Sequence, residues 1–144
     1  MTQIHATCID IDGMAVLLRG APGSGKSDLA LRLIDGGARL VADDRVDLEV
    51  RDGRVVASAP AEIAGLFEVR GLGVLATEHI AESPLGAIVD LVAAEAVERI
   101  PEEAAEDILG VSFPLYRLAP FEASAPAKVR LAVRCAQGHI KAVP

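Results

Sequence analysis

The sequence contains no asparagine, only two cysteines and no long apolar run. Without asparagine, the chain lacks the Asn-Lys-x-Asp element with which GTP-driven switches read guanine. Cys8 and Cys135 are too far apart for a metal-ligand spacing, so we expect buried apolar residues rather than a metal site. No apolar run approaches the ~18 residues of a membrane span, and no basic segment followed by an apolar core marks a secretory signal. These absences favour a cytoplasmic protein without a membrane partner.

Basic residues are also few, with 14 Lys and Arg against 21 Asp and Glu and a net charge of −7. This balance argues against binding nucleic acid through its phosphates, which requires clustered basic side chains. It does not argue against a nucleotide, because a local loop and a metal ion neutralise the charge of a nucleotide. The chain has 144 residues, 51% of them hydrophobic, so we expect one folded domain over residues 1–144.

A phosphate-binding motif stands near the N-terminus. It matches G-x-x-x-x-G-K-[ST] and consists of Gly20, Ala21, Pro22, Gly23, Ser24, Gly25, Lys26 and Ser27. The apolar run 14–18 before it suits a buried strand, and 28–34 after it suits an amphipathic helix. In such a loop the main-chain N–H groups curl around phosphate oxygens, the lysine reaches the terminal phosphates and the serine hydroxyl can hold Mg²⁺. The motif therefore predicts a nucleoside triphosphate site.

Short apolar segments separated by turn residues predict an α/β fold around this motif. Asp-Gly pairs at 12–13 and 52–53 predict two β-hairpins. The other expected elements are a strand within 2–12, a strand at 38–42, a helical turn at 61–66, a short strand from Phe67, a central strand at 87–94, an edge strand at 111–118, a loop at 119–127 and a final strand at 128–135. Residues 97–110 are expected to form a loop and then a helix from Pro101 to Gly110.

The strand at 38–42 ends in two acids, Asp43 and Asp44. Open α/β sheets bind ligands at the carboxyl ends of their strands. One carboxylate there can orient Mg²⁺ or its water, and another can accept a proton from a nucleophile. The structural alternative is a pair of turn acids that accept hydrogen bonds from nearby N–H groups. Because the phosphate loop lies upstream, we favour the active-site interpretation.

Position alone leaves the roles of three other charged or polar residues open. His5 lies on the first strand, near the mouth of the phosphate loop if the hairpin closes at 12–13, and position alone favours an ordinary strand histidine. Glu68 and Arg70 alternate on one face of a short strand, and the glycines that follow allow close approach to a ligand. A solvated strand face explains Glu68 and Arg70 equally well.

Taken together, these segments resemble the catalytic, C-terminal domain of the HPr kinase/phosphorylase family. The resemblance covers nearly the whole chain and rests on the strand bearing His5, the phosphate loop, Val41-Ala42-Asp43-Asp44, Glu68-Val69-Arg70-Gly71-Leu72-Gly73 and Ile108-Leu109-Gly110-Val111. It implies a P-loop kinase domain of the HPr kinase/PEP carboxykinase-like type, with a mixed sheet and flanking helices. It also implies a homo-oligomeric enzyme that uses ATP and Mg²⁺ to phosphorylate a serine of HPr, a carrier protein of the sugar phosphotransferase system.

The resemblance assigns roles to individual residues. Asp43 matches the base that takes the serine proton, Lys26 and the loop amides match the phosphate binders, and Ser27 and Glu68 match the Mg²⁺ ligands. His5 and Arg99 align with further active-site residues, and Asp44 and Arg70 lie within the matching motifs. Residues 67–76 match the stretch that serves both directions of catalysis.

The chain departs from the family in two places. Full-length members carry an extra N-terminal domain, whereas this sequence starts almost at the catalytic strand, as a short form would. The family usually has an Arg-, Pro- and Gly-rich loop near the C-terminus that is associated with dephosphorylation. Here that segment is 119–128, and only Lys128 and Arg130 supply positive charge nearby. We therefore expect the kinase activity more firmly than phosphorolysis of phosphoseryl-HPr.

Two alternative functions follow from the phosphate loop alone. A small-molecule P-loop kinase usually carries an arginine-rich lid, and the sequence has no compact arginine cluster. A non-catalytic ATP-binding regulatory module needs no catalytic groups, so the presence of Lys26, Ser27, Asp43 and Glu68 argues against it.

Overall fold

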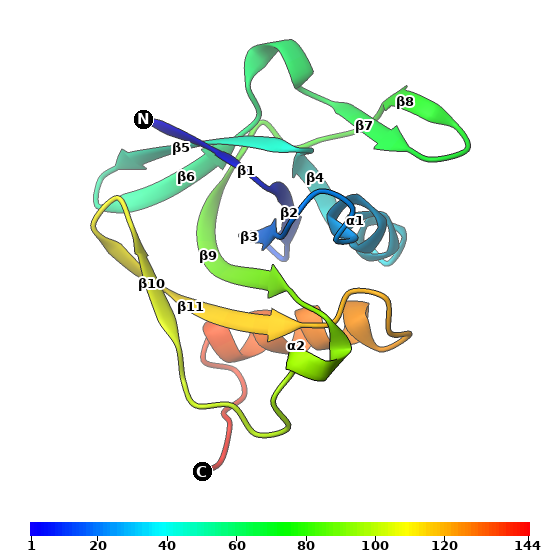
Figure 1. Ribbon diagram of the computed structural model, residues 1–144. Helices are drawn as coiled ribbons and strands as arrows, with labels where there is room; N and C mark the ends of the chain where they lie inside the picture. The colour runs from blue at the N-terminus through cyan, green and yellow to red at the C-terminus, as the bar shows by residue number, and fades with distance from the viewer.

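The chain forms a curled mixed sheet with two helices packed on one side of it (Figure 1). This computed structural model describes residues 1–144. The strands of the main sheet are β1 (Thr2–His5), β2 (Thr7–Ile11), β3 (Met14–Arg19), β4 (Arg39–Ala42), β5 (Arg45–Arg51), β6 (Arg54–Ser58), β9 (Glu82–Leu91), β10 (Ala105–Ile108) and β11 (Val111–Leu118). The helices are α1 (Lys26–Asp35) and α2 (Ala125–Ala136), and two short 3₁₀ turns lie at Ala61–Ile63 and Ala94–Ala96. Neither helix has the length and apolarity of a membrane span.

The strand order is β1-β5-β6-β9-β3-β2-β4; β11 joins this order through β9, and β10 pairs with β11 alone. The pairs β3–β9 and β9–β11 are parallel, and every other pair in this sheet is antiparallel. The long strand β9 pairs with β6 through its first residues and with β11 through its last ones. A separate hairpin of β7 (Leu66–Val69) and β8 (Gly73–Ala76) stands beside α1. The mixed sheet and flanking helices expected from the sequence are confirmed.

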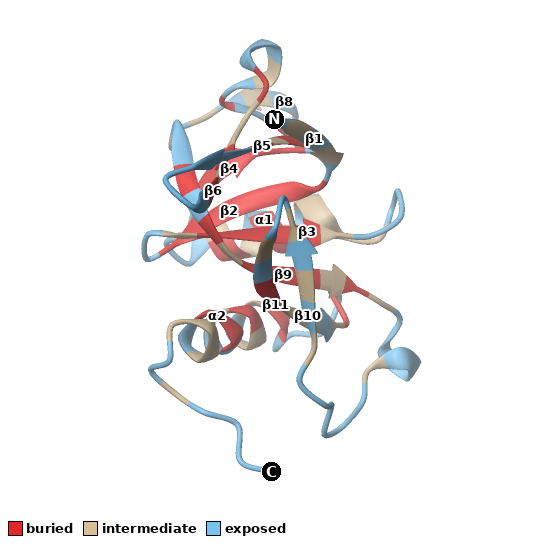
Figure 2. Cartoon of the chain, turned by 90° about the vertical axis from the view of Figure 1, so that its left-hand side faces the viewer, coloured by how far each residue is buried: buried red, intermediate tan, exposed pale blue.

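Two hydrophobic cores lie on opposite faces of the central strands, where β2 and the middle of β3 are buried (Figure 2). Because side chains alternate along a strand, β3 sends Val16 and Leu18 toward the helices and Ala15 and Leu17 toward the other face. The first core is completed by the inward faces of α1 and α2, and the second by β5 and β6 curling over the sheet. A strand buried on both faces reads as a continuous apolar run, and 14–18 is such a run.

Both Asp-Gly hairpins are confirmed. Asp12 and Gly13 join β2 to β3, Asp52 and Gly53 join β5 to β6, and all four residues have positive φ. Two-residue turns with positive φ at both positions match the twist of the flanking strands, and Asp-Gly is among the sequences that favour them. The N-terminal strand is interrupted, however, because β1 pairs with β5 whereas β2 pairs with β3 and β4.

The strand expected at 128–135 is wrong, because these residues belong to helix α2. Val129, Leu131 and Val133 alternate, which favoured a strand, but Leu131 is 49% exposed while Val129 and Val133 are buried. The buried positions of the helix are Ala125, Val129, Ala132 and Val133, a spacing of three and four residues. Pro126 fits the first turn of a helix, where its missing N–H has no partner to lose.

The helix expected from Pro101 to Gly110 is also wrong. Residues 105–108 form β10, which pairs with β11 through a turn in which Leu109 and Gly110 both have positive φ. The glycine ends a strand and not a helix. The edge assignment of 111–118 is wrong as well, because β11 pairs with β10 through its first half and with β9 through its second. Pro114, which has no N–H to donate, stands where the partner changes.

A matched pair of substitutions tests the helical packing. Leu33→Ala removes a fully buried side chain of α1 and is expected to lower the free energy of unfolding by about 2–5 kcal/mol. Leu131→Ala removes the same atoms from the exposed face of α2 and is expected to change it by no more than about 0.5 kcal/mol. Urea unfolding followed by circular dichroism measures both, and an equal loss in the two variants would contradict this orientation of α2.

Candidate active site

The phosphate loop joins the end of β3 to the start of α1, as the sequence predicts. Gly23 and Gly25 adopt positive φ, which lets the chain turn tightly before Lys26 begins the helix. Lys26 Nζ folds back over the loop and donates to the carbonyl oxygens of Gly20 at 2.7 Å and Ala21 at 3.2 Å. The Ser24 hydroxyl in the same loop is the one buried side-chain polar atom without a hydrogen-bond partner. Because Lys26 is bonded only to carbonyl oxygens of its own loop, it is free to exchange them for phosphate oxygens.

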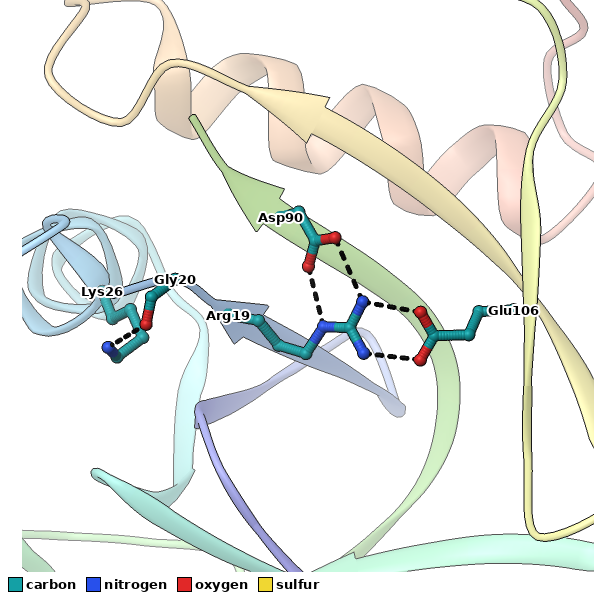
Figure 3. A network of polar contacts seen from close by, with 5 residues as sticks. All are labelled: Arg19, Gly20, Lys26, Asp90 and Glu106. Carbon is teal, nitrogen blue, oxygen red and sulfur yellow. Dashed lines mark hydrogen bonds and ion pairs between the residues drawn. The ribbon is translucent and has the colours of Figure 1, made fainter. Parts of the chain in front are cut away.

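An arginine at the end of β3 fixes the entrance to this loop (Figure 3). Arg19 donates to both carboxylate oxygens of Asp90 on β9 and to both of Glu106 on β10, at 2.6–3.1 Å. Its planar guanidinium provides two parallel pairs of donors, the geometry in which arginine binds carboxylates most strongly. These contacts raise the pKa of Arg19 and lower that of Glu106. Arg19 thereby links β3, β9 and β10 at the residue immediately before the phosphate loop begins.

Asp43 connects the phosphate loop to the rest of the site. Its Oδ1 accepts hydrogen bonds from Ser27 Oγ at 2.8 Å and Thr7 Oγ1 at 3.1 Å, and its Oδ2 accepts one from the main-chain N–H of Glu68 at 3.2 Å. The residue is 8% exposed. A buried carboxylate is tolerated when its oxygens find donors, and these three donors come from α1, β2 and β7. Sequence reasoning missed Thr7, since a threonine inside a strand gives no signal of a polar contact.

Asp44 occupies a different position from its neighbour. It is exposed, has a φ of 69° and lines the cleft over the phosphate loop. Aspartate is one of the few non-glycine residues that adopt this conformation readily. The turn after β4 therefore directs one carboxylate under the loop and the other toward the open cleft.

The cleft has a volume of about 470 Å³ and collects most of the predicted residues. Its walls come from the phosphate loop and α1, from Asp44, from β7 and its turn, and from the loop that follows β11. Glu68 and Arg70 line it, so the alternation on β7 belongs to this cleft. Phe121, from the β11–α2 loop, also lines it and was not singled out from the sequence.

His5 and Arg99 do not line the cleft. His5 is exposed and faces Arg45 across the β1–β5 pair, and the next residue, Ala6, donates its N–H to the carbonyl of Asp44 at 3.1 Å. The histidine therefore lies beside the Asp44 turn, at the margin of the site. Arg99 lies exposed in the segment between the second 3₁₀ turn and β10. Catalytic roles for these two residues stay predictions.

The oxygen atoms around Ser27 that could bind a metal ion suit Mg²⁺ better than a softer metal. The chain has no cluster of three His, Cys, Asp or Glu side chains that would enclose a metal ion. Mg²⁺ does not need one, because it keeps several waters and takes one or two protein oxygens together with phosphate oxygens. The Ser27 hydroxyl, the Asp43 carboxylate bonded to it and the Glu68 carboxylate on β7 are oxygen donors of this kind.

Comparison with known proteins identifies the family and matches the fold. The family model described as "HPr Serine kinase C-terminal domain" matches residues 1–119. The HPr kinase/phosphorylase of Clostridium tetani is 45% identical over 74 residues, and that of Streptococcus thermophilus is 48% identical over 75 residues. Each alignment covers 51% of this chain and 24% of the relative, so the matched segment spans about a quarter of these relatives.

A solved structure matches over almost the full length. The structure titled as the Hpr(Ser) kinase/phosphatase from Coxiella burnetii superposes with a TM-score of 0.85 and 27% sequence identity. The superposition covers 96% of this chain and 98% of that one. The phosphate loop, the Asp43–Asp44 turn and the β7–β8 hairpin all lie within residues 1–119, which the family model matches.

The Arg19 network is expected to contribute stability that depends on pH. Because the folded-state pKa of Glu106 is lowered, its contribution is present above the unfolded-state value of about 4.3 and is lost as pH falls through the folded-state value. Glu106→Gln should therefore lower the melting temperature at pH 7, and the difference from wild type should shrink below about pH 4.

Glu82→Gln is the matched control, because Glu82 pairs with Arg51 in the same two-pronged way but the side chains of that pair are more exposed to solvent screening, at 50% and 44% against 38% and 24% for Glu106 and Arg19. Its effect should be smaller and should fade in high salt. A Glu106→Gln effect that is independent of pH between 3 and 7 would show that the ion pair is not the source of the stability.

Proposed function

The chain belongs to the family of the HPr serine kinase C-terminal domain, and we propose that it transfers the γ-phosphoryl group of ATP to a serine hydroxyl of an HPr-type phosphocarrier protein. The observation that carries the proposal is the hydrogen bond from Ser27 of the phosphate loop to Asp43, a carboxylate that also accepts the N–H of Glu68. Asp43 itself does not line the cleft, but its partners Ser27 and Glu68 do, together with Lys26 and Asp44. The chain also belongs to a family whose model is described as a serine kinase domain.

The reaction forms a bond between the serine oxygen and the γ-phosphorus and breaks the bond from that phosphorus to the β–γ bridging oxygen. The products are ADP and phosphoserine, and the serine proton passes to a carboxylate. In this class of reaction the protein contributes chiefly positioning and electrostatic stabilisation. When bound, Mg²⁺ supplies positive charge to the phosphates, and Ser27 and Glu68 are the residues that would hold it.

This chain's own residues divide the remaining work. The loop amides and Lys26 bind and orient the phosphates, once Lys26 exchanges the carbonyls of Gly20 and Ala21 for phosphate oxygens. Asp43 is the proposed proton acceptor. Its two oxygens accept three hydrogen bonds and a carboxylate has about four lone-pair sites, so capacity to accept a proton remains. Asp44 faces the open cleft beside it, where an incoming hydroxyl arrives.

Asp43→Asn is expected to abolish phosphorylation of HPr while ATP binding persists. An amide accepts at one oxygen only, so its NH₂ group would face the Glu68 N–H or the Ser27 hydroxyl, at a stability cost of about 1–3 kcal/mol. The test is intact mass of HPr after incubation with ATP and Mg²⁺, alongside calorimetric binding of ATP and a melting curve of each variant.

Asp44→Asn serves as the matched control, since its side chain lies outside these hydrogen bonds. Lys26→Ala should lose both transfer and most of the ATP affinity. A folded Asp43→Asn variant that phosphorylates HPr at the wild-type rate, with Asp44→Asn inactive, would move the base to Asp44. Phosphate found on a small alcohol and not on HPr would favour a small-molecule kinase.

The reverse reaction, attack of inorganic phosphate on phosphoseryl-HPr, is proposed to be weaker. Lys128 and Arg130 both lie in α2, where Lys128 pairs with Glu122 at 3.0 Å and Arg130 donates to the carbonyl of Leu33 at 3.3 Å. Neither side chain lines the cleft, so Lys26 and Arg70 are the cations that face an incoming phosphate there. A cytoplasmic location and a homo-oligomeric assembly are part of the same proposal, and light scattering of the purified protein tests the assembly.

A further inference from the structure

We propose that Phe121 is a stacking platform for the base of the nucleotide, a subsite that rests on nucleotide binding in the proposed function. The chain has three phenylalanines. Phe67 and Phe113 are buried at 3% and 6% exposure, whereas Phe121 is 69% exposed and lines the cleft. An exposed ring at the nucleotide cleft is an apolar surface that a planar ligand can cover.

The ring lies directly against the phosphate loop. A Cβ atom placed on Gly25 would come within 2.9 Å of Phe121 Cε1 and Cζ, and within 3.2 Å of Pro120 Cβ. Gly25 also has a φ of 98°, so the position requires glycine for its backbone and for its neighbour. The ring therefore packs on the loop itself while most of its surface still faces solvent.

The loop that carries the ring is tied down on both sides of it. Arg32 of α1 donates to the carbonyl oxygens of Pro120 and Glu122, the residues before and after Phe121. Glu122 in turn pairs with Lys128 of α2. Because both neighbours of Phe121 are bonded to one guanidinium, the backbone that carries the ring is held in place before a ligand binds. Binding a base to this ring therefore costs little further conformational entropy.

The arrangement of the elements separates the two ends of the ligand. In Figure 1 the β7–β8 hairpin and the β11–α2 loop lie on opposite sides of α1. The hairpin carries Glu68, and the N–H of this residue donates to Asp43, so phosphoryl transfer belongs to that side. On the other side, the β11–α2 loop brings the ring of Phe121 to the cleft. With the phosphates held in the loop, the base extends toward this side.

The chemistry of the subsite favours stacking over reading of base edges. The charged groups that hold the loop are already paired, because Arg32 bonds to Asp28 as well as to the two loop carbonyls and Lys128 bonds to Glu122. Stacking of a base on an aromatic ring contributes about 1–3 kcal/mol and tolerates every base, since each has a π-face. We therefore expect Phe121 to add affinity for ATP and GTP alike.

The test compares a nucleotide with its phosphates alone. Phe121→Ala is expected to weaken binding of Mg²⁺–ATP and Mg²⁺–GTP by about 5- to 150-fold in calorimetry, and to leave binding of Mg²⁺–tripolyphosphate unchanged. Leu131→Ala, a second exposed apolar residue outside the cleft, should leave the affinity for all three ligands unchanged. Because the chain has no tryptophan, Phe121→Trp places a single reporter in the subsite. Its fluorescence should change with ATP and not with tripolyphosphate.

Several results would contradict the proposal that Phe121 stacks on the base. Equal weakening of ATP and tripolyphosphate in Phe121→Ala would mean that the ring only shapes the loop. An unchanged ATP affinity with a raised KM for HPr would make the ring a docking surface for the acceptor protein. A wild-type chain that binds tripolyphosphate as tightly as ATP would leave no base subsite to explain. By contrast, the expected nucleotide pattern in a chain that does not phosphorylate HPr would refute the proposed function and support the platform.

Discussion

The buried carboxylate of Asp43 is the contact on which the site depends. It is 8% exposed, and its three hydrogen bonds draw together β2, the start of α1 and β7. A buried carboxylate that lacks hydrogen-bond donors destabilises the folded state by several kcal/mol. The three segments are therefore held in the one arrangement that supplies all three donors. The phosphate loop and the Glu68 strand are therefore not independent parts of the cleft. They share one acceptor, and moving either one away leaves that acceptor short of a donor.

The strands around β3 hold the start of the phosphate loop, and with it the contact between Ser27 and Asp43, in a fixed position. Strand β3 is buried on both faces because the sheet carries helices on one side and curls its own strands over the other. Arg19, at the end of β3, holds β9 and β10 through two carboxylates immediately before the loop begins (Figure 3). Residues 20–23 of the loop are exposed, so the strand before the loop and the helix after it do much to fix its position. Such support is what keeps a binding loop close to its productive geometry.

The sequence predicted the parts of the site that follow from local chemistry. The phosphate loop, the acids after β4 and the Asp-Gly hairpins have strong short-range signals, and each was found where expected. Glu68 and Arg70 became specific only through the family resemblance, since an alternating charge pair on a strand is as often a solvated face. The failures came where two periods fit one segment. In 128–135 the apolar residues satisfy a spacing of two and a spacing of four, and only packing against α1 and β11 decides.

Other features depend on contacts between distant residues and have no local signal. The Thr7 bond to Asp43 spans 36 positions, and the Arg19 bond to Glu106 spans 87. The turn at Leu109 and Gly110 was obscured because leucine rarely adopts positive φ, so Gly110 looked like the end of a helix. Phe121 was passed over for a similar reason: a lone aromatic residue in a loop gains meaning only when the loop lies against Gly25.

The charges around the cleft make sense only if the ligand arrives with a cation. Asp28, Asp44 and Glu68 line the same cleft as Lys26 and Arg70, so a site proposed to hold a highly charged triphosphate has more acids than bases on its walls. Two carboxylates beside phosphate oxygens repel them, and the repulsion is strongest where water is excluded. A divalent cation reverses the sign of that interaction, because the same carboxylates then face positive charge. A serine nucleophile also needs an acceptor for its proton, and an all-basic cleft would lack one. The mixed charge of this cleft is thus better suited to phosphoryl transfer than to tight storage of a nucleotide, which is why the acids and not the phosphate loop distinguish a kinase from a binding module.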